Sequence, residues 1–410
     1  MKIFFSCFFN SFFIVTPHLY TIGNSSEEIY LSLIKARYEN KKVLFLTPFN
    51  LFYFYQRDIQ CNELIKIRSK YSVSQRNIFV ILLRIIFSFF VLFCRIVDFF
   101  LNKFFNITDS FFRDNAICPR LGISKIYNPY NGDIPDIEHN TQRYSWERAF
   151  IRPLNLSKSF SKNIALFSIL GIKQSKYVCL HVRSSDTYDD FHEAIERNAD
   201  INNYYLLINF LIKNGYKVVR MGDPRMPKLK KINGLFDYAH SNFNNKFNDQ
   251  CLIANCSFYI GTTSGIWGLA WLFEKDMLVF NNPSWHYSSP KSNDIDLYKL
   301  FYDKKNKKTL KISEWISNHY GALHFTKLLD KRYKPIENSP NDLCIAVQNY
   351  LLNKRMSPNQ SLKIKKLIRA SALKYIRMNL DIPKDALYRF YLMSYLAQGN
   401  LDKSFYKKFY

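Results

Sequence analysis

The stretch Tyr177–Asp186 reads YVCLHVRSSD and changes character within a few residues. It begins as a run of apolar residues that favour β structure, which is typical of a strand in the middle of a sheet. It ends in His181, Arg183 and Asp186, which are polar or ionisable. Open α/β sheets bind ligands at the carboxyl ends of their strands, and an arginine there suits a phosphate. The stretch therefore predicts an anion site at the end of a buried strand.

Two further motifs follow predicted strands of the same sheet. Gly261-Thr262-Thr263-Ser264-Gly265 joins a strand to a helix. Such a turn presents backbone N–H groups to an anion, although helix capping explains its Thr and Ser equally well. Gly222 permits close approach of a nucleoside, and Asp223 suits ribose hydroxyls, or the pair forms an ordinary turn before proline. Asp237 and Tyr238 are candidates to flank the nucleoside.

The order of the predicted elements indicates an α/β fold. Strands are expected at 177–183, 216–222, 258–261 and 277–280, with helices between them. Asp200 is expected to cap the first of these helices and Asp249 to cap another. A βαβαβ order implies a parallel sheet with right-handed crossovers.

The amino-terminal half predicts a second, similar unit. A strand is expected at 12–16, a helix capped at Ser25 and Ser26 follows, and another strand is expected at 42–48. The alternative for residues 1–15 is a signal peptide, which the lack of a small-residue cleavage site disfavours. A chain of 410 residues suits two cores, with a boundary near 128–156. We expect domains at 1–155 and 156–340, followed by a basic helical tail at 341–410.

The composition limits the classes of binding partner but does not select one of them. The net charge of +25 indicates an anionic partner, such as a membrane face, a nucleic acid or a nucleotide, or reflects AT-rich codons. No nucleic-acid module is recognisable, so we expect no nucleic-acid partner. Buried thiols at Cys179, Cys251 and Cys256 are typical of a reducing cytoplasm.

No pattern in the sequence calls for a metal or a cofactor. No Cys-x-x-Cys pair or zinc spacing occurs. The one Asp-x-Asp pair, Asp294-Ile295-Asp296, is expected to be a solvated loop or a helix start rather than a metal site.

Residues 77–105 form an apolar insertion that Arg84 and Arg95 interrupt. A membrane-spanning helix needs about 20 residues with few charges, and the longest uncharged run is half of that. Two interpretations remain: a helical hairpin buried between domains, or an amphipathic element in the membrane interface. The basic tail is either membrane-facing, interdomain or a solvated helical surface.

The motifs between 177 and 283 resemble a group of bacterial glycosyltransferases found with surface-polysaccharide genes. His-Val-Arg-x-x-Asp, Gly-Tyr-x-Val-x-Arg-Met-Gly and Ile-Gly-Thr-Thr-Ser-Gly carry the resemblance. The first is also similar to the His-x-Arg motif of fucosyltransferases that use a GDP-sugar. The chain departs from the group at Asn24, which follows Gly23 where many members have His.

The resemblance implies a GT-B arrangement, in which two Rossmann-like domains with parallel sheets face a cleft, with helices at the carboxyl terminus. It implies an inverting, metal-independent sugar transfer without a cofactor, with a GDP-sugar favoured as the donor. Arg183 would bind the donor β-phosphate, Thr263 and Ser264 the diphosphate, and Gly222 would admit the nucleoside.

The acceptor needs a general base. Asp186 is the expected base, with Glu27 and His18 on the acceptor side as rivals. His181 is either a second catalytic group or a hydrogen-bonded core residue.

The functional prediction is therefore a nucleotide-sugar-dependent glycosyltransferase of surface-polysaccharide synthesis. It would act on a glycan or a lipid-linked acceptor, as a peripheral protein of the cytoplasmic face of the inner membrane. The alternative is a non-catalytic, membrane-peripheral protein that binds nucleotides or glycans without turnover.

Overall fold

The computed structural model describes residues 12–15, 17, 22–47, 49, 64–105, 153–160, 164–172, 176–185, 195–317, 332–378, 394–395 and 397–410. The predicted general base, Asp186, and its acceptor-side rival, His18, lie outside these residues. The chain forms two compact units, Met1–Ser145 with Pro153–Ser159 and Trp146–Arg152 with Phe160–Tyr410.

The second unit is built on a seven-stranded sheet in which every neighbouring pair is parallel. The strand order is β12-β8-β7-β6-β3-β4-β5. The strands are β3 (Tyr177–His181), β4 (Lys217–Arg220), β5 (Leu235–Asp237), β6 (Tyr259–Gly261), β7 (Met277–Asn282), β8 (Ile295–Tyr298) and β12 (Asn400–Leu401). The predicted α/β class and parallel sheet are confirmed.

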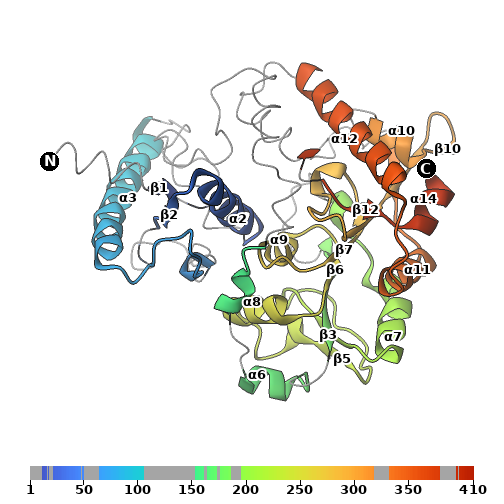
Figure 1. Cartoon of the computed structure of the whole chain (residues 1–410), viewed down its shortest axis with the longest axis horizontal. Helices are drawn as coiled ribbons and strands as arrows, with labels where there is room; N and C mark the ends of the chain where they lie inside the picture. The colour runs from blue at the N-terminus through green and yellow to red at the C-terminus, as the bar shows by residue number, and fades with distance from the viewer. Residues whose placement is uncertain are drawn as a thin grey trace. The chain divides into compact units, whose positions relative to one another are not determined.

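The order of the six strands from β5 to β8 is that of a doubly wound sheet. From β3 the chain moves to β4 and β5 on one side, and then returns to build β6, β7 and β8 on the other. Helices cover both faces (Figure 1), with α8 (Lys246–Asn255) and α9 (Gly265–Leu272) on one and α7 (Tyr205–Lys213) and α11 (Pro340–Leu351) on the other. Residues of β3 and β7 are buried throughout, which accounts for the apolar run that begins each strand before its polar end.

Smaller elements complete the second unit. A three-stranded antiparallel sheet has the order β10-β9-β11. Its strands are β9 (Leu300–Asp303), β10 (Lys308–Thr309) and β11 (Tyr333–Ile336). The remaining helices are α6 (Ile164–Ile169), α10 (Ile312–Ser317), α12 (Pro358–Met378) and α14 (Lys403–Phe409). The carboxyl-terminal segment contributes β12 to the main sheet, so it is part of this unit.

The first unit begins as a βαβ motif. Strands β1 (Phe12–Val15) and β2 (Lys42–Phe45) are parallel, and α2 (Ile22–Glu39) connects them. The predicted cap at Ser25 and Ser26 is wrong, because α2 starts three residues earlier and both serines are buried within it. The hydroxyl of Ser26 instead donates to the carbonyl oxygen of Ile22, one turn back (2.6 Å).

Residues 78–105 form one continuous helix, α3 (Ile78–Phe105), so of the two interpretations of this segment the helical hairpin is wrong. Its sequence contains neither a glycine nor a proline that would end the helix midway. One side of α3 packs on the β1–β2 sheet through a core of Leu44, Leu46, Val80, Phe87 and Val91; Figure 1 shows the helix beside these two strands. Among the described residues, no helix has the length and apolarity needed to cross a membrane.

The described cysteines agree with the sequence analysis. Cys179, Cys251 and Cys256 are free thiols in the core, and Cys344 is half-buried. Cys179 lies in β3, the central strand at which the order of the main sheet reverses.

Candidate functional site

The predicted anion-binding motifs meet where the sheet order reverses. His181 ends β3, and Arg183 lies two residues beyond it. Gly261 ends β6, the strand paired with β3 on the other side of the reversal. The turn 262–264 then leads into α9. Doubly wound sheets bind ligands in the crevice at this reversal. The sheet topology brings together there two motifs that lie some eighty residues apart in the sequence.

Three hydrogen bonds join the two motifs. The N–H of Thr262 donates to the carbonyl oxygen of His181 (3.0 Å). The N–H of Arg183 donates to the hydroxyl of Thr262 (2.9 Å). The hydroxyl of Ser264 and Nδ1 of His181 are 3.0 Å apart. The two turns are therefore one bonded structure that extends past the ends of the strands.

Gly261 is required by the close approach of these strands. A Cβ atom there would lie 2.6 Å from the hydroxyl of Tyr259 and closer still to the carbonyl oxygen of His181. Both distances are too short for real contacts, and the backbone carbonyl cannot move aside without disturbing the pairing of β3 with β6. The glycine thus serves the junction between the strands, which the sequence pattern of the turn did not indicate.

The guanidinium of Arg183 is held inside the unit. Arg183 is buried, and Nη1 donates to the side-chain oxygen of Asn198. Lys299, which directly follows β8, donates from Nζ to the carbonyl oxygen of Asn198 (2.6 Å). Burial lowers the pKa of Lys299 to about 8, although Glu337 and Glu196 oppose this. Two cationic side chains therefore converge on one asparagine.

Sequence reasoning missed Asn198 and Lys299. The available signal was the position of Lys299, which follows a strand as Arg183 does.

His181 is a buried and neutral group. Burial, together with the nearby charges of Arg220 and Arg183, lowers its pKa to about 3. At neutral pH the ring carries no charge, and its bond to Ser264 orients that hydroxyl. The geometry gives His181 a positioning role beside the turn.

Unsatisfied polar atoms also mark this edge. Thr263 and Asn282 are buried, and neither Oγ1 of Thr263 nor Nδ2 of Asn282 has a hydrogen-bond partner. They follow or end neighbouring strands, β6 and β7. Ser264 is the N-cap residue of α9, but its side chain makes no capping bond. Buried polar groups without partners are rare in native proteins, so these atoms are available to bond a polar ligand or a water molecule.

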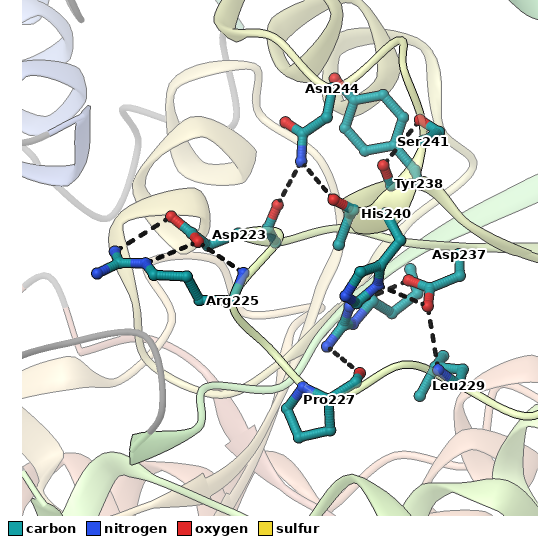
Figure 2. A network of polar contacts seen from close by, with 12 residues as sticks. Asp223, Arg225, Pro227, Leu229, Asp237, Tyr238, His240, Ser241 and Asn244 are labelled. Carbon is teal, nitrogen blue, oxygen red and sulfur yellow. Dashed lines mark hydrogen bonds and ion pairs between the residues drawn. The ribbon is translucent and has the colours of Figure 1, made fainter.

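The predicted nucleoside residues form a network at the ends of β4 and β5, which Figure 2 shows. Gly222 has φ of 142°, in the region that favours glycine, and its carbonyl oxygen accepts from Nδ2 of Asn244 (2.9 Å). The same Asn244 nitrogen donates to the carbonyl oxygen of Ala239 (2.9 Å). Asn244, which the sequence analysis did not single out, thus ties the turn after β4 to the turn after β5.

Asp223 is the more exposed carboxylate of this network. It accepts hydrogen bonds from the backbone N–H and the guanidinium of Arg225. Burial raises its pKa, but the bonds from Arg225 outweigh burial and the net pKa is lowered. Asp223 is therefore a half-exposed carboxylate that stays charged at neutral pH.

Asp237 and Tyr238 have partners within the protein. One oxygen of Asp237 pairs with Arg220 (3.0 Å), and the other meets Nδ1 of His240 (2.9 Å) and accepts from the N–H of Leu229 (3.1 Å). The hydroxyl of Tyr238, which is buried, donates to the carbonyl oxygen of Asn245 (3.1 Å). Both side chains shape the turns around the predicted nucleoside position (Figure 2).

Two expectations about carboxylates are wrong. Asp294 and Asp296 are buried rather than solvated, because Asp296 lies within β8 and Asp294 directly precedes it. Asp294 accepts from the N–H of Met277 (2.8 Å), and Asp296 from the hydroxyl of Ser289 (2.8 Å). Burial raises the pKa of Asp294 to about 8 and that of Asp296 to about 7.

Asp249 does not cap α8. Asn245 is the N-cap residue, and its side chain accepts from the N–H of Asn248. Asp249 lies in the first turn, where burial raises its pKa to about 7. By contrast, the predicted cap at Asp200 is confirmed, although the element that it caps is a short 3₁₀ helix, Ile201–Tyr204, that precedes α7.

The remaining predicted residue, Glu27, lies in α2 of the first unit and is buried. No group of three or more potential metal ligands occurs among the residues that the structure describes. Comparison of the chain with protein-family models, curated proteins and solved structures finds no match.

Proposed function

We propose that the chain is a glycosyltransferase that takes a sugar from a nucleoside-diphosphate donor. The single observation that supports this most strongly is the bonded pair of turns after β3 and β6, at the reversal of the sheet order. A permanently charged arginine, two hydroxyls and a helix start converge there. This is the combination that binds a diphosphate without requiring a metal ion.

The donor diphosphate would lie against the amino end of α9. The first-turn N–H groups of α9 donate no bond to the side chain of Ser264, and the hydroxyl of Thr263 has no partner. A phosphate oxygen would satisfy both. The guanidinium of Arg183 would exchange its bond to Asn198 for a charge-assisted bond to the β-phosphate, which is the stronger of the two.

In the proposed reaction, an acceptor hydroxyl oxygen attacks the anomeric carbon of the sugar and forms the new glycosidic bond. The bond between that carbon and the phosphate oxygen breaks, and the nucleoside diphosphate leaves with the electron pair. The arginine and the helix amides stabilise the charge that develops on the leaving oxygen. A general base takes the hydroxyl proton, and Asp186 is the proposed base, with Glu27 and His18 as alternatives.

The two units would bind different substrates. The second unit would bind the donor and the first unit the acceptor, as in a GT-B enzyme with inversion at the anomeric carbon. The acceptor would be a glycan or a lipid-linked glycan, and the protein would be peripheral to the membrane. His181, neutral and bonded to Ser264, would position the diphosphate-binding turn rather than transfer protons.

The decisive experiment measures donor binding by calorimetry with GDP-, UDP-, CMP- and TDP-sugars. Replacing Arg183 by Gln should weaken binding of the preferred nucleotide by roughly tenfold to a hundredfold, the usual effect of a lost charge-assisted bond. Arg332→Gln is the control, because it removes a half-exposed arginine that pairs with Asp303 in the antiparallel sheet. Equal affinity in the wild-type protein and in Arg183→Gln would refute the proposed site.

Because Arg183 is buried, its replacement can also disturb the fold. Ser264→Ala removes one hydroxyl from the same turn and provides a milder second variant, with circular dichroism as the check on folding. Release of the nucleoside diphosphate in the presence of a crude glycolipid fraction then separates an enzyme from a non-catalytic binding protein. Donor binding without release would favour the latter.

A further inference from the structure

The outer side of α3 is apolar along the whole helix. Among its described side chains, twelve large apolar residues are at least 38% exposed. The six most exposed are Ile78, Ile86, Phe89, Phe93, Phe99 and Phe104. A helix of this length extends for about 42 Å, and surfaces this large and apolar on monomeric proteins mark sites of interaction.

Two polar side chains of α3, Arg84 and Ser88, face its own unit rather than this surface. Arg84 is half-buried, donates from Nε to the carbonyl oxygen of Thr47 (2.9 Å), and lies over the ring of Phe49. Ser88 is buried and accepts from the N–H of Phe49 (2.9 Å). Both side chains are thus directed toward the segment after β2, where they bond α3 to its own unit. These contacts fix which side of α3 faces its own unit, and the exposed residues on the other side are mostly apolar.

The charges near the helix indicate what covers this surface. Residues 64–105 contain seven Lys and Arg and one acidic residue, Asp98. Four of these, Lys66, Arg68, Lys70 and Arg76, lie before the helix and are exposed. At the other end Lys103 is exposed and lies over the rings of Phe99 and Phe104. Basic residues that flank an apolar helix surface match the headgroups of an anionic bilayer.

We infer that the outer side of α3 is a docking surface for an anionic lipid bilayer, with the helix axis in the membrane plane. The net charge of +25 favours this occupant over a second copy, since two such chains repel each other. Phe and Ile side chains along the helix would enter the acyl region while the flanking Lys and Arg contact phosphates. This inference rests on the proposed function, in which the protein is peripheral to the membrane, and names the surface that would bind the membrane.

The test is cosedimentation of the full chain with vesicles of phosphatidylcholine, with and without phosphatidylglycerol. The double variant Ile86→Glu/Phe93→Glu places two charges on the exposed surface and should lower the affinity for anionic vesicles by about a hundredfold or more. Leu206→Glu/Leu352→Glu is the matched control, because both residues are exposed and lie on the second unit. It should bind as the wild type does.

A second variant tests the electrostatic part. Replacing Lys66, Arg68 and Lys70 by Gln should weaken binding at low salt and reduce its dependence on salt concentration. Wild-type binding that does not distinguish anionic from neutral vesicles would overturn the assignment to an anionic bilayer.

Two other results would overturn the docking surface itself. One is unchanged vesicle binding by Ile86→Glu/Phe93→Glu. The other is a wild-type dimer, seen by sedimentation velocity, that this variant dissociates, since a second copy would then cover α3. Nucleotide-sugar affinity should be the same in all these variants, so this inference and the proposed donor site can fail independently.

Discussion

The carboxyl edge of the main sheet and the outer side of α3 depart from the usual distribution of side chains in opposite directions. The sheet edge buries Arg183, His181 and Lys299, whereas α3 exposes large apolar residues along its whole length. Each departure costs free energy in the isolated protein, because desolvated polar groups and hydrated apolar surface are both unfavourable. This contrast supports the two proposals, a polar ligand at the sheet edge and an apolar surface against α3.

The largest expected effect is the pH dependence of stability that comes from carboxyl groups buried in the second unit. Asp294 and Asp296 have pKa values raised by burial to about 8 and about 7, above the ordinary 3.8. The folded state therefore holds their protons more tightly than the unfolded state, and stability falls as the pH rises from about 4 to about 8. The lowered pKa of His181 acts oppositely, but only between about 3 and 6.5.

The window from pH 6.5 to 8 lies above the titration of His181. Asp249, with a pKa of about 7, also titrates in it and should contribute equally in the wild type and in the double variant. Urea denaturation across it should show stability falling with pH in the wild type and a much flatter dependence in Asp294→Asn/Asp296→Asn. Asp303→Asn is the control, since bonds from Arg332 lower the pKa of Asp303 to about 2, far below the window. An identical slope in the wild type and the double variant would mean that these carboxyls titrate normally.

The next largest effect is the difference in the free energy of unfolding between substitutions on the two sides of α3. Phe87 is buried against the β1–β2 sheet, so Phe87→Ala should cost about 3–5 kcal/mol in the free energy of unfolding. Phe93 is 64% exposed, so Phe93→Ala should change it by less than about 0.5 kcal/mol. Urea denaturation followed by circular dichroism measures both. Comparable losses would show that the outer side is packed against protein.

A smaller loss of stability is expected from a substitution at the junction of β3 and β6. Gly261→Ala should cost roughly 1–3 kcal/mol or more, because the added methyl meets backbone and a buried ring. Gly215→Ala is the control, with φ of 81° but no atom within 4 Å of the added carbon, and should cost about 1 kcal/mol. If thermal melts show equal losses for the two variants, the close approach of the strands is not limiting.

The smallest expected changes in the free energy of unfolding have opposite signs at two adjacent threonines, Thr262 and Thr263. Thr263→Val should raise the free energy of unfolding by about 1 kcal/mol, because a buried hydroxyl without a partner is removed. Thr262→Val should lower it by about 1–3 kcal/mol, because the N–H of Arg183 loses its acceptor. Thr263→Val should also weaken nucleotide binding. Loss of stability in both variants would argue against a vacant ligand position at Thr263.

The site was predictable where its residues follow strands along the chain. Arg183, Gly222 and Thr262 to Gly265 were recognised because a polar residue directly after a buried strand is informative by itself. The partners Asn198, Asn244 and Lys299 were missed, because each is defined by what it touches across the fold. Asp294 and Asp296 were misjudged for a related reason: polar residues in a loop-like sequence indicate solvent, and β8 is a strand buried between two others.

The sequence alone was enough to predict the α/β class, the parallel sheet and the positions of the motifs that we propose bind an anion, because apolar periodicity and the residues after each strand are local properties. Only the tertiary structure decided that β3 and β6 are neighbours, that Gly261 lies against a carbonyl, and that α3 is one helix with an apolar outer side. The physical reason is that strand order, burial and side-chain pairing depend on contacts between distant segments, which local preferences do not specify.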